Sequence, residues 1–236
     1  MPDSLHERYD HDERQLVLTA SVDLWSDEML DAVVDAAAPL LEGASWREVP
    51  EGAPPRWSQR STAMLALAAM ALRATRTVAL TVRAGYSAEA LGGLRRLFEA
   101  SGHAQRVAED ASGQYAENWL HGRGTAAKAR VAFGAAEDDP FWGFMSGQSH
   151  AEFAAYVNLS AAFDEERGLV HTIGPNRDPF SDSIWLWFAV RHLARVLASL
   201  LTVHPQLDDT DFLKAMRPIY AAEERLHAEI TEPEAQ

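Results

Sequence analysis

The spacing of hydrophobic and polar positions is helical over most of the chain. Apolar side chains recur every three to four residues across long segments, which is the period of an α-helix that buries one face. We find no alternating segment that predicts a β-strand. The pattern predicts helices at 26–43, at 58–84, from 87 onward, at 112–121, at 125–134, at 183–203 and at 209–230. The segment 141–163 is readable as two further helical pieces. The fold class expected is all-α.

Capping and helix-breaking residues set the expected boundaries. Ser26, Ser87, Ser112 and Thr125 stand where N-caps are expected, because a side-chain oxygen at that position accepts a hydrogen bond from the first turn. Proline and glycine make 44–57 a loop, and 164–182 is expected to be a second loop. Residues 1–25 form a polar N-terminal segment, 26–230 a single helical domain and 231–236 a polar tail.

Two long helices are expected to form the centre of the architecture. A turn at Gly85 joins the helix at 58–84 to the one that begins at Ser87, so the two form an αα-hairpin. The segment 183–203 is apolar around most of its circumference and is expected to run through the middle of the fold. We therefore expect a bundle of about seven or eight helices built around the hairpin.

Composition and charge exclude several classes of protein. The 236 residues carry 35 acidic against 21 basic side chains, for a net charge of -14, which disfavours nucleic acid as a partner. Cysteine is absent and the N-terminus is charged, so neither disulfides nor a signal peptide is expected and the protein is expected to be cytoplasmic. Arginines interrupt the apolar stretch 61–84, and we therefore expect no membrane span there.

Charged residues gather in the segment 83–103, inside apolar helix. In an antiparallel hairpin that turns near residue 85, Arg83 lies near Glu89 and Arg73 lies near Glu99. A buried arginine–carboxylate lattice between the two helices is one interpretation. Catalysis and anion or metal binding are the other two, and Arg96 and His103 are then expected to lie nearer a pocket.

The order of motifs resembles a widespread family of uncharacterised bacterial all-helical proteins. The resemblance rests on Arg83, Glu89, the segment "LRRLFE", the segment "AENWLHG" and the Ser-x-x-x-His segment "SGQSH". It implies a helical bundle in which six side chains gather as a binding site: Arg83, Glu89, Arg96, Glu99, Ser146 and His150. Trp142 is expected to add an apolar wall beside them.

Such families also resemble the HEPN group, whose ribonucleases use an Arg-x4-6-His motif. Arg96 and His103 fit that spacing, and with His150 they are the candidate catalytic residues. A histidine can transfer protons while an arginine stabilises the charge of a phosphorane. The alternative function is therefore a metal-independent HEPN-like ribonuclease, in a toxin or phage-defence setting.

The histidines do not assemble a recognisable metal site. Glutamate and histidine share a helical face at Glu99 and His103, and again at Glu117 and His121, but only Glu224-x-x-His227 has the spacing of di-iron bundles, and it has no second copy. We expect no metal and no cofactor. The function expected is a binding module for a small molecule or a protein partner, and the long apolar helix predicts a homodimer.

Overall fold

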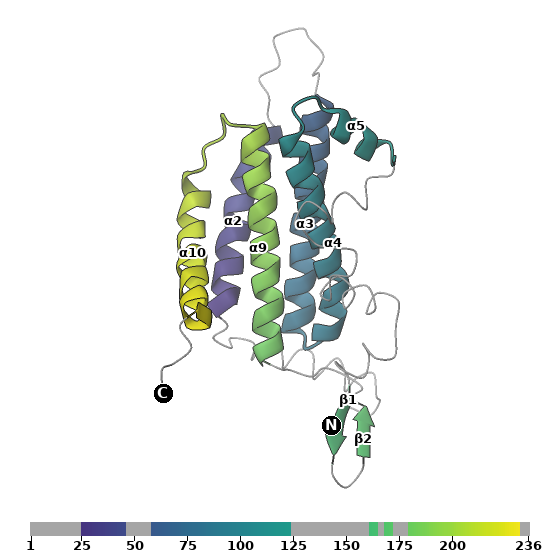
Figure 1. Ribbon diagram of the computed structural model, residues 1–236, viewed down its shortest axis with the longest axis vertical. Helices are drawn as coiled ribbons and strands as arrows, with labels where there is room; N and C mark the ends of the chain where they lie inside the picture. The colour runs from purple at the N-terminus through teal and green to yellow at the C-terminus, as the bar shows by residue number, and fades with distance from the viewer. Residues whose placement is uncertain (1–24, 46–57, 124–160, 165–167, 172–178, 232–236) are drawn as a thin grey trace, which may run out of the picture.

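The computed structural model describes residues 25–45, 58–123, 161–164, 168–171 and 179–231. This part of the chain is all-α apart from one short β-ribbon (Figure 1). Its helices are α2 (Trp25–Ser45), α3 (Gln59–Arg83), α4 (Ser87–Glu109), α5 (Gln114–Leu120), α9 (Pro179–Val203) and α10 (Thr210–Thr231). The helices expected at 125–134 and within 141–163 lie outside the described residues, apart from the last three positions of 141–163.

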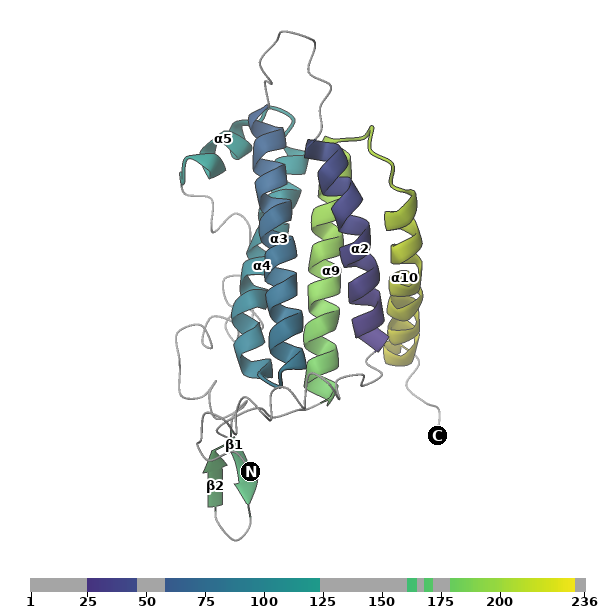
Figure 2. The same cartoon turned by 180° about the vertical axis from the view of Figure 1, so that it is seen from behind.

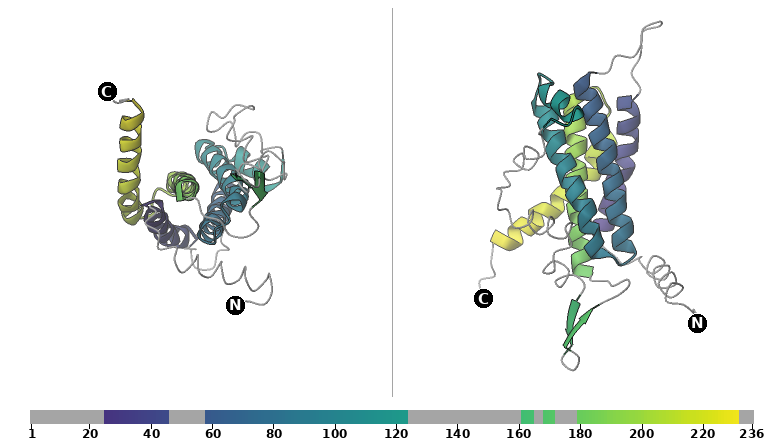
Figure 3. Two further views of the ribbon diagram at one scale, coloured as in Figure 1. Left: turned by 90° about the horizontal axis from the view of Figure 1, so that it is seen from below. Right: turned by 90° about the vertical axis from the view of Figure 1, so that its right-hand side faces the viewer.

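Helix α9 occupies the middle of the described helices. It packs against α2, α3 and α4, and the view from below in Figure 3 shows it enclosed between α10 on one side and the α3 and α4 pair on the other. Its leucines 186, 193, 197 and 200 are fully buried. The expectation that the apolar helix at 183–203 is central is therefore confirmed, because an all-round apolar helix is stable only with neighbours on most sides.

Helices α3 and α4 run side by side in opposite directions. Gly85 has φ 82° in the turn between them, a left-handed conformation that glycine adopts at no steric cost. Farther along, a Cβ placed on Gly93 would lie 2.8 Å from Cγ2 of Val78. The two backbones approach this closely because Gly93 has no side chain.

The two helices are also joined at the other end. The Arg60 guanidinium donates from Nε to the carbonyl of Val107 at 2.9 Å, and from Nη2 to the carbonyl of Ala108. These carbonyls belong to the last turn of α4, where no backbone donor of the helix remains to bind them. Arg60 therefore fastens the start of α3 to the end of α4.

Two of the predicted caps are wrong. Ser87 is not a cap, because α4 already begins at Ser87 and its N-cap is Tyr86. The N-cap of α5 is Gly113 rather than Ser112, and the carboxylate of Asp110 accepts from the Tyr115 amide at 2.6 Å. Ser58, for which no cap was predicted, is the N-cap of α3, and its Oγ accepts from the amide of Ser61 at 3.0 Å.

The β-ribbon corrects two expectations, that residues 161–163 are helical and that 164–182 is an irregular segment. Strands β1 (Ala161–Asp164) and β2 (Gly168–His171) pair antiparallel, with Ala161 opposite His171. Each strand has four residues, which is too short for an alternating pattern to stand out from its surroundings. The ribbon is a small addition to a helical fold.

Within the residues that the structure describes, two helices are long and apolar enough to cross a membrane by length and composition, at Gln59–Arg83 and Asp182–Val203. About half of each apolar window, 50% and 56% respectively, is buried inside the protein. The core helix of a soluble protein passes the same test, so this finding is weak evidence for a span.

Candidate functional site

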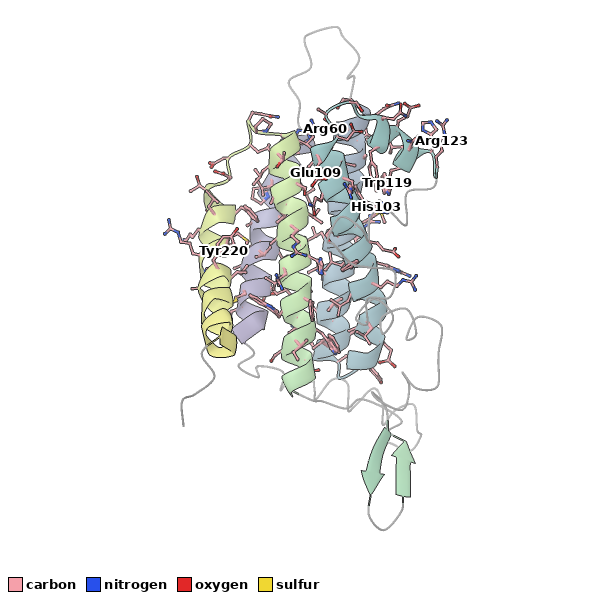
Figure 4. All side chains as sticks on the ribbon, in the orientation of Figure 1. Arg60, His103, Glu109, Trp119, Arg123 and Tyr220 are labelled. Atoms are coloured by element: carbon pink, nitrogen blue, oxygen red, sulfur yellow. The ribbon has the colours of Figure 1, made fainter. Side chains whose placement is uncertain are left out.

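A cavity of about 210 Å³ lies between α9 and α10. In Figure 1 the ribbon of α2 is drawn between those of α10 and α9, and Figure 4 labels Tyr220 on α10. We call this cavity the α9–α10 groove. Its lining consists of Arg191, Ala194, Arg195, Ala198, Phe212, Met216, Ile219 and Tyr220.

The apolar part of the groove follows from helical spacing. Phe212, Met216 and Ile219 are four and three residues apart, so they share the face of α10 that is turned inward, and all three are buried. Opposite them α9 presents Ala194 and Ala198. The small alanines leave space in front of the large α10 side chains, and that space is the groove.

Two arginines provide the charge of the groove. Arg191 and Arg195 are four residues apart on α9 and therefore lie on one face of it. Their positive field reaches the neighbouring His192, whose pKa is lowered to about 3, first by burial and then by the charges of Arg195 and Arg191. An anionic group in the groove would meet a favourable potential.

The lining combines an apolar surface with positive charge. Among the described residues that line the groove there is no carboxylate, histidine, serine or threonine. An apolar floor beside two guanidinium groups suits a molecule with an apolar body and an anionic end.

A buried serine–histidine pair lies deeper in the core, between α4 and α9. Ser101 Oγ is 2.8 Å from Nδ1 of His192 and 2.9 Å from the carbonyl of Phe98. A hydroxyl has one proton, so both contacts are hydrogen bonds only if the imidazole Nδ1–H donates to the serine and the serine donates to Phe98. His192 therefore does not act as a base on Ser101, and the pair ties α4 to α9.

A second histidine is bonded between α4 and α5. Nδ1 of His103 lies 2.8 Å from the hydroxyl of Tyr115, and the Trp119 ring lies 6.0 Å from the imidazole; Figure 4 shows His103 and Trp119 close together. Burial lowers the pKa of His103 to about 4 and raises the pKa of Tyr115 to about 12. His103 is therefore a neutral side chain at pH 7.

Among the candidate catalytic residues that the structure describes, Arg96 and His103 differ in their surroundings. Arg96 is exposed, whereas His103 on the same helix is buried. The proton-transfer role expected for His103 suits a solvent-facing imidazole of pKa near 7, which this one is not. Nothing among the described side chains favours the ribonuclease alternative, and Trp142, Ser146 and His150 lie outside the described residues.

The expected buried charge lattice is wrong for the residues that the structure describes. Arg83 binds Asp31 of α2 at 3.2 Å, and Glu99 binds Arg95 at 3.4 Å. Glu89 and Arg73, the expected partners, are both exposed. The lattice does not form because α3 and α4 contact each other through apolar faces, at the close approach of Gly93. The charged residues of the two helices therefore face solvent.

The glutamate–histidine pairs make other contacts. Glu117 lies 3.8 Å from Arg123, and Nδ1 of His121 is bonded to the backbone carbonyl of Glu117. The described residues contain no group of three or more possible metal ligands. The side chains of Glu224 and His227 are outside the described set.

The sequence patterns did not predict the groove. Arg191 and Arg195 are four residues apart, as are Ala194 and Ala198, so all four lie on one side of α9. Small residues beside two arginines at helical spacing were the available signal.

No family model, no curated protein and no solved structure matches this chain. Function is therefore inferred from the geometry of the described residues.

Proposed function

We propose that this protein is a binding module whose α9–α10 groove takes a small anionic molecule with an apolar body. The observation that carries the proposal is the cavity of about 210 Å³ that combines a buried apolar floor with Arg191 and Arg195. Each guanidinium has five N–H donors, so it can bind a carboxylate or sulfonate in addition to its contacts within the protein.

The volume limits the size of the ligand. Sites for drug-sized molecules measure about 300–1,000 Å³, and this groove is smaller. The ligand is therefore a small molecule, or one end of a larger one. The proposal takes the protein as cytoplasmic and its complete domain as a bundle of seven or eight helices built around α3 and α4.

An anionic aromatic probe tests the proposal directly. Anilinonaphthalene sulfonate has an apolar ring system and one negative group, and its fluorescence rises when it leaves water. We expect it to bind the folded protein at one site per chain. Ala198→Trp places a large ring in the groove and is expected to weaken binding at least about tenfold, which corresponds to about 1.4 kcal/mol.

The control is the same substitution at Ala111, an exposed alanine in the turn between α4 and α5. Ala111→Trp leaves the groove open and is expected to bind the probe as the unmodified protein does. Arg195→Gln removes one positive charge from the groove and is expected to weaken binding as well. Equal binding by Ala198→Trp and Ala111→Trp would show that the probe binds elsewhere and would reject the proposal.

A further inference from the structure

The outer face of α2 carries a row of acidic side chains. Glu28, Asp31, Asp35 and Glu42 are all exposed, and their spacing of three, four and seven residues keeps them on one side of the helix. The opposite side of α2 is buried against α9 and α10. We call these four residues the α2 acidic stripe.

The outer face of α3 carries the opposite charge. Arg73 and Arg76 are exposed, and within the described part of the chain neither forms an ion pair. We call them the α3 basic pair. Around them stand exposed apolar side chains, with Met70 50% and Leu80 54% accessible. This surface is unusual in a chain of net charge -14.

The two charged surfaces lie beside each other on one side of the molecule. Figures 2 and 3 show α2 and α3 on the side away from α9, and the ion pair between Arg83 and Asp31 joins them near one end. Measured from the Arg83–Asp31 ion pair, Arg76 lies about 10 Å and Arg73 about 15 Å along α3. In the same direction along α2, Asp35 lies about 6 Å and Glu42 about 17 Å from that ion pair. Acidic and basic residues therefore stand at similar heights.

We propose that this face is the interface of a homodimer, in which the α2 acidic stripe of each copy lies over the α3 basic pair of the other. A two-fold axis in the interface and parallel to the helices places α2 opposite α3 at equal heights. A two-fold axis in the interface but perpendicular to the helices would place α2 over α2 and set acid against acid. The distribution of charge selects the first arrangement.

The size of the face fits an interface of modest strength. Two helices of more than 20 residues, about 10 Å apart, present a surface of about 30 by 20 Å. Each copy then buries about 600 Å², which brings the total above the roughly 1,000 Å² expected of a specific contact. The exposed Met70 and Leu80 supply apolar area beside the charges.

This inference is independent of the proposed function, because the groove is lined by α9 and α10 and the dimer face by α2 and α3. Charge reversal tests it. The double variants Arg73→Glu/Arg76→Glu and Asp35→Arg/Glu42→Arg each set like charges opposite one another. Each is expected to raise the dimer dissociation constant at least about 100-fold, measured by analytical ultracentrifugation of the full chain.

Mixing the two double variants restores opposite charges across the interface, and we expect a heterodimer of one chain of each. The control Lys214→Glu/Arg217→Glu makes the same kind of charge change on exposed positions of α10 and is expected to remain a dimer. Because all the substituted side chains are exposed, circular dichroism should show each variant folded. A monomeric unmodified protein at about 100 µM, variants that dimerise like the control, or a mixture that stays monomeric would overturn the proposal.

Discussion

At the scale of single residues, the buried polar side chains join helices that are far apart in the sequence. Ser101 of α4 bonds His192 of α9, and His103 of α4 bonds Tyr115 of α5. A buried polar atom without a partner costs more than an average hydrogen bond contributes. These side chains therefore specify which faces of the helices meet.

Removing the hydroxyl of Ser101 tests that role. Ser101→Ala removes the hydroxyl that bonds Nδ1 of the buried His192, and we expect the free energy of unfolding to fall by about 1–3 kcal/mol. Ser199 is the matched control, because its hydroxyl bonds only the carbonyl of Arg195 in its own helix, at 2.9 Å. Ser199→Ala is expected to change stability by less than about 0.5 kcal/mol. Urea unfolding measures both, and equal losses would contradict the role given to Ser101.

At the scale of secondary-structure elements, the close approach of α3 and α4 depends on one of two adjacent glycines. A Cβ on Gly93 would meet Cγ2 of Val78 at 2.8 Å and the carbonyl of Ala74 at 3.4 Å, whereas a Cβ on Gly92 meets nothing within 4 Å. Val78 is β-branched and stiff in a helix, so it cannot easily turn aside. The two positions separate packing from helix propensity.

Alanine substitutions at these two glycines should change the free energy of unfolding in opposite directions. Gly93→Ala forces the helices apart, and we expect a loss of about 1–3 kcal/mol in the free energy of unfolding. Gly92→Ala removes a flexible residue from a helix interior without a clash, and we expect a gain of about 0.5–1 kcal/mol. Thermal unfolding of the two variants provides the comparison. A stabilised Gly93→Ala variant would show that the contact with Val78 yields without cost.

The sequence predicts the described helices better than it predicts their contacts. Helices α3 and α9 follow from the period of their apolar positions, which depends on neighbours in the chain. The β-ribbon was not predicted because each strand has only four residues. The charge lattice was wrong because sequence spacing gives which residues are level in a hairpin but not how the helices are rotated about their axes.

The groove depends on a tertiary relation that no local pattern contains. Periodicity places Phe212, Met216 and Ile219 on one face of α10, but it equally predicts that this face is fully covered. Only the position of α10 relative to Ala194 and Ala198 leaves the space open. For the same reason the candidate site expected around Arg96 and Glu99 could not be distinguished in advance from solvated surface.

At the scale of the whole molecule, the buried histidines couple stability to pH. The pKa of His103 is lowered to about 4 by burial, and that of His192 to about 3, mainly by burial. In the unfolded chain both rings are hydrated and titrate near pH 6.5. Between these values the unfolded chain binds protons that the folded protein does not, so acid favours unfolding.

We therefore expect the contribution of these two histidines to the free energy of unfolding to be constant above about pH 7. The free energy of unfolding should decrease as the pH falls from about 6.5 toward 4. Each histidine contributes up to about 1.4 kcal/mol per pH unit within that window. His103→Asn keeps a polar atom near Nδ1 for the bond to Tyr115 but does not titrate. Its free energy of unfolding is measured in urea between pH 4.5 and 7.5. As the pH falls, it should decline less steeply than that of the unmodified protein, because the variant takes up about one proton fewer on unfolding. Above pH 7 the two curves should run parallel. If the two free energies of unfolding had equal slopes against pH below pH 6, His103 would be protonated alike in the folded and unfolded chain. That result would contradict the prediction, which rests on the burial of the His103 ring between Tyr115 and Trp119.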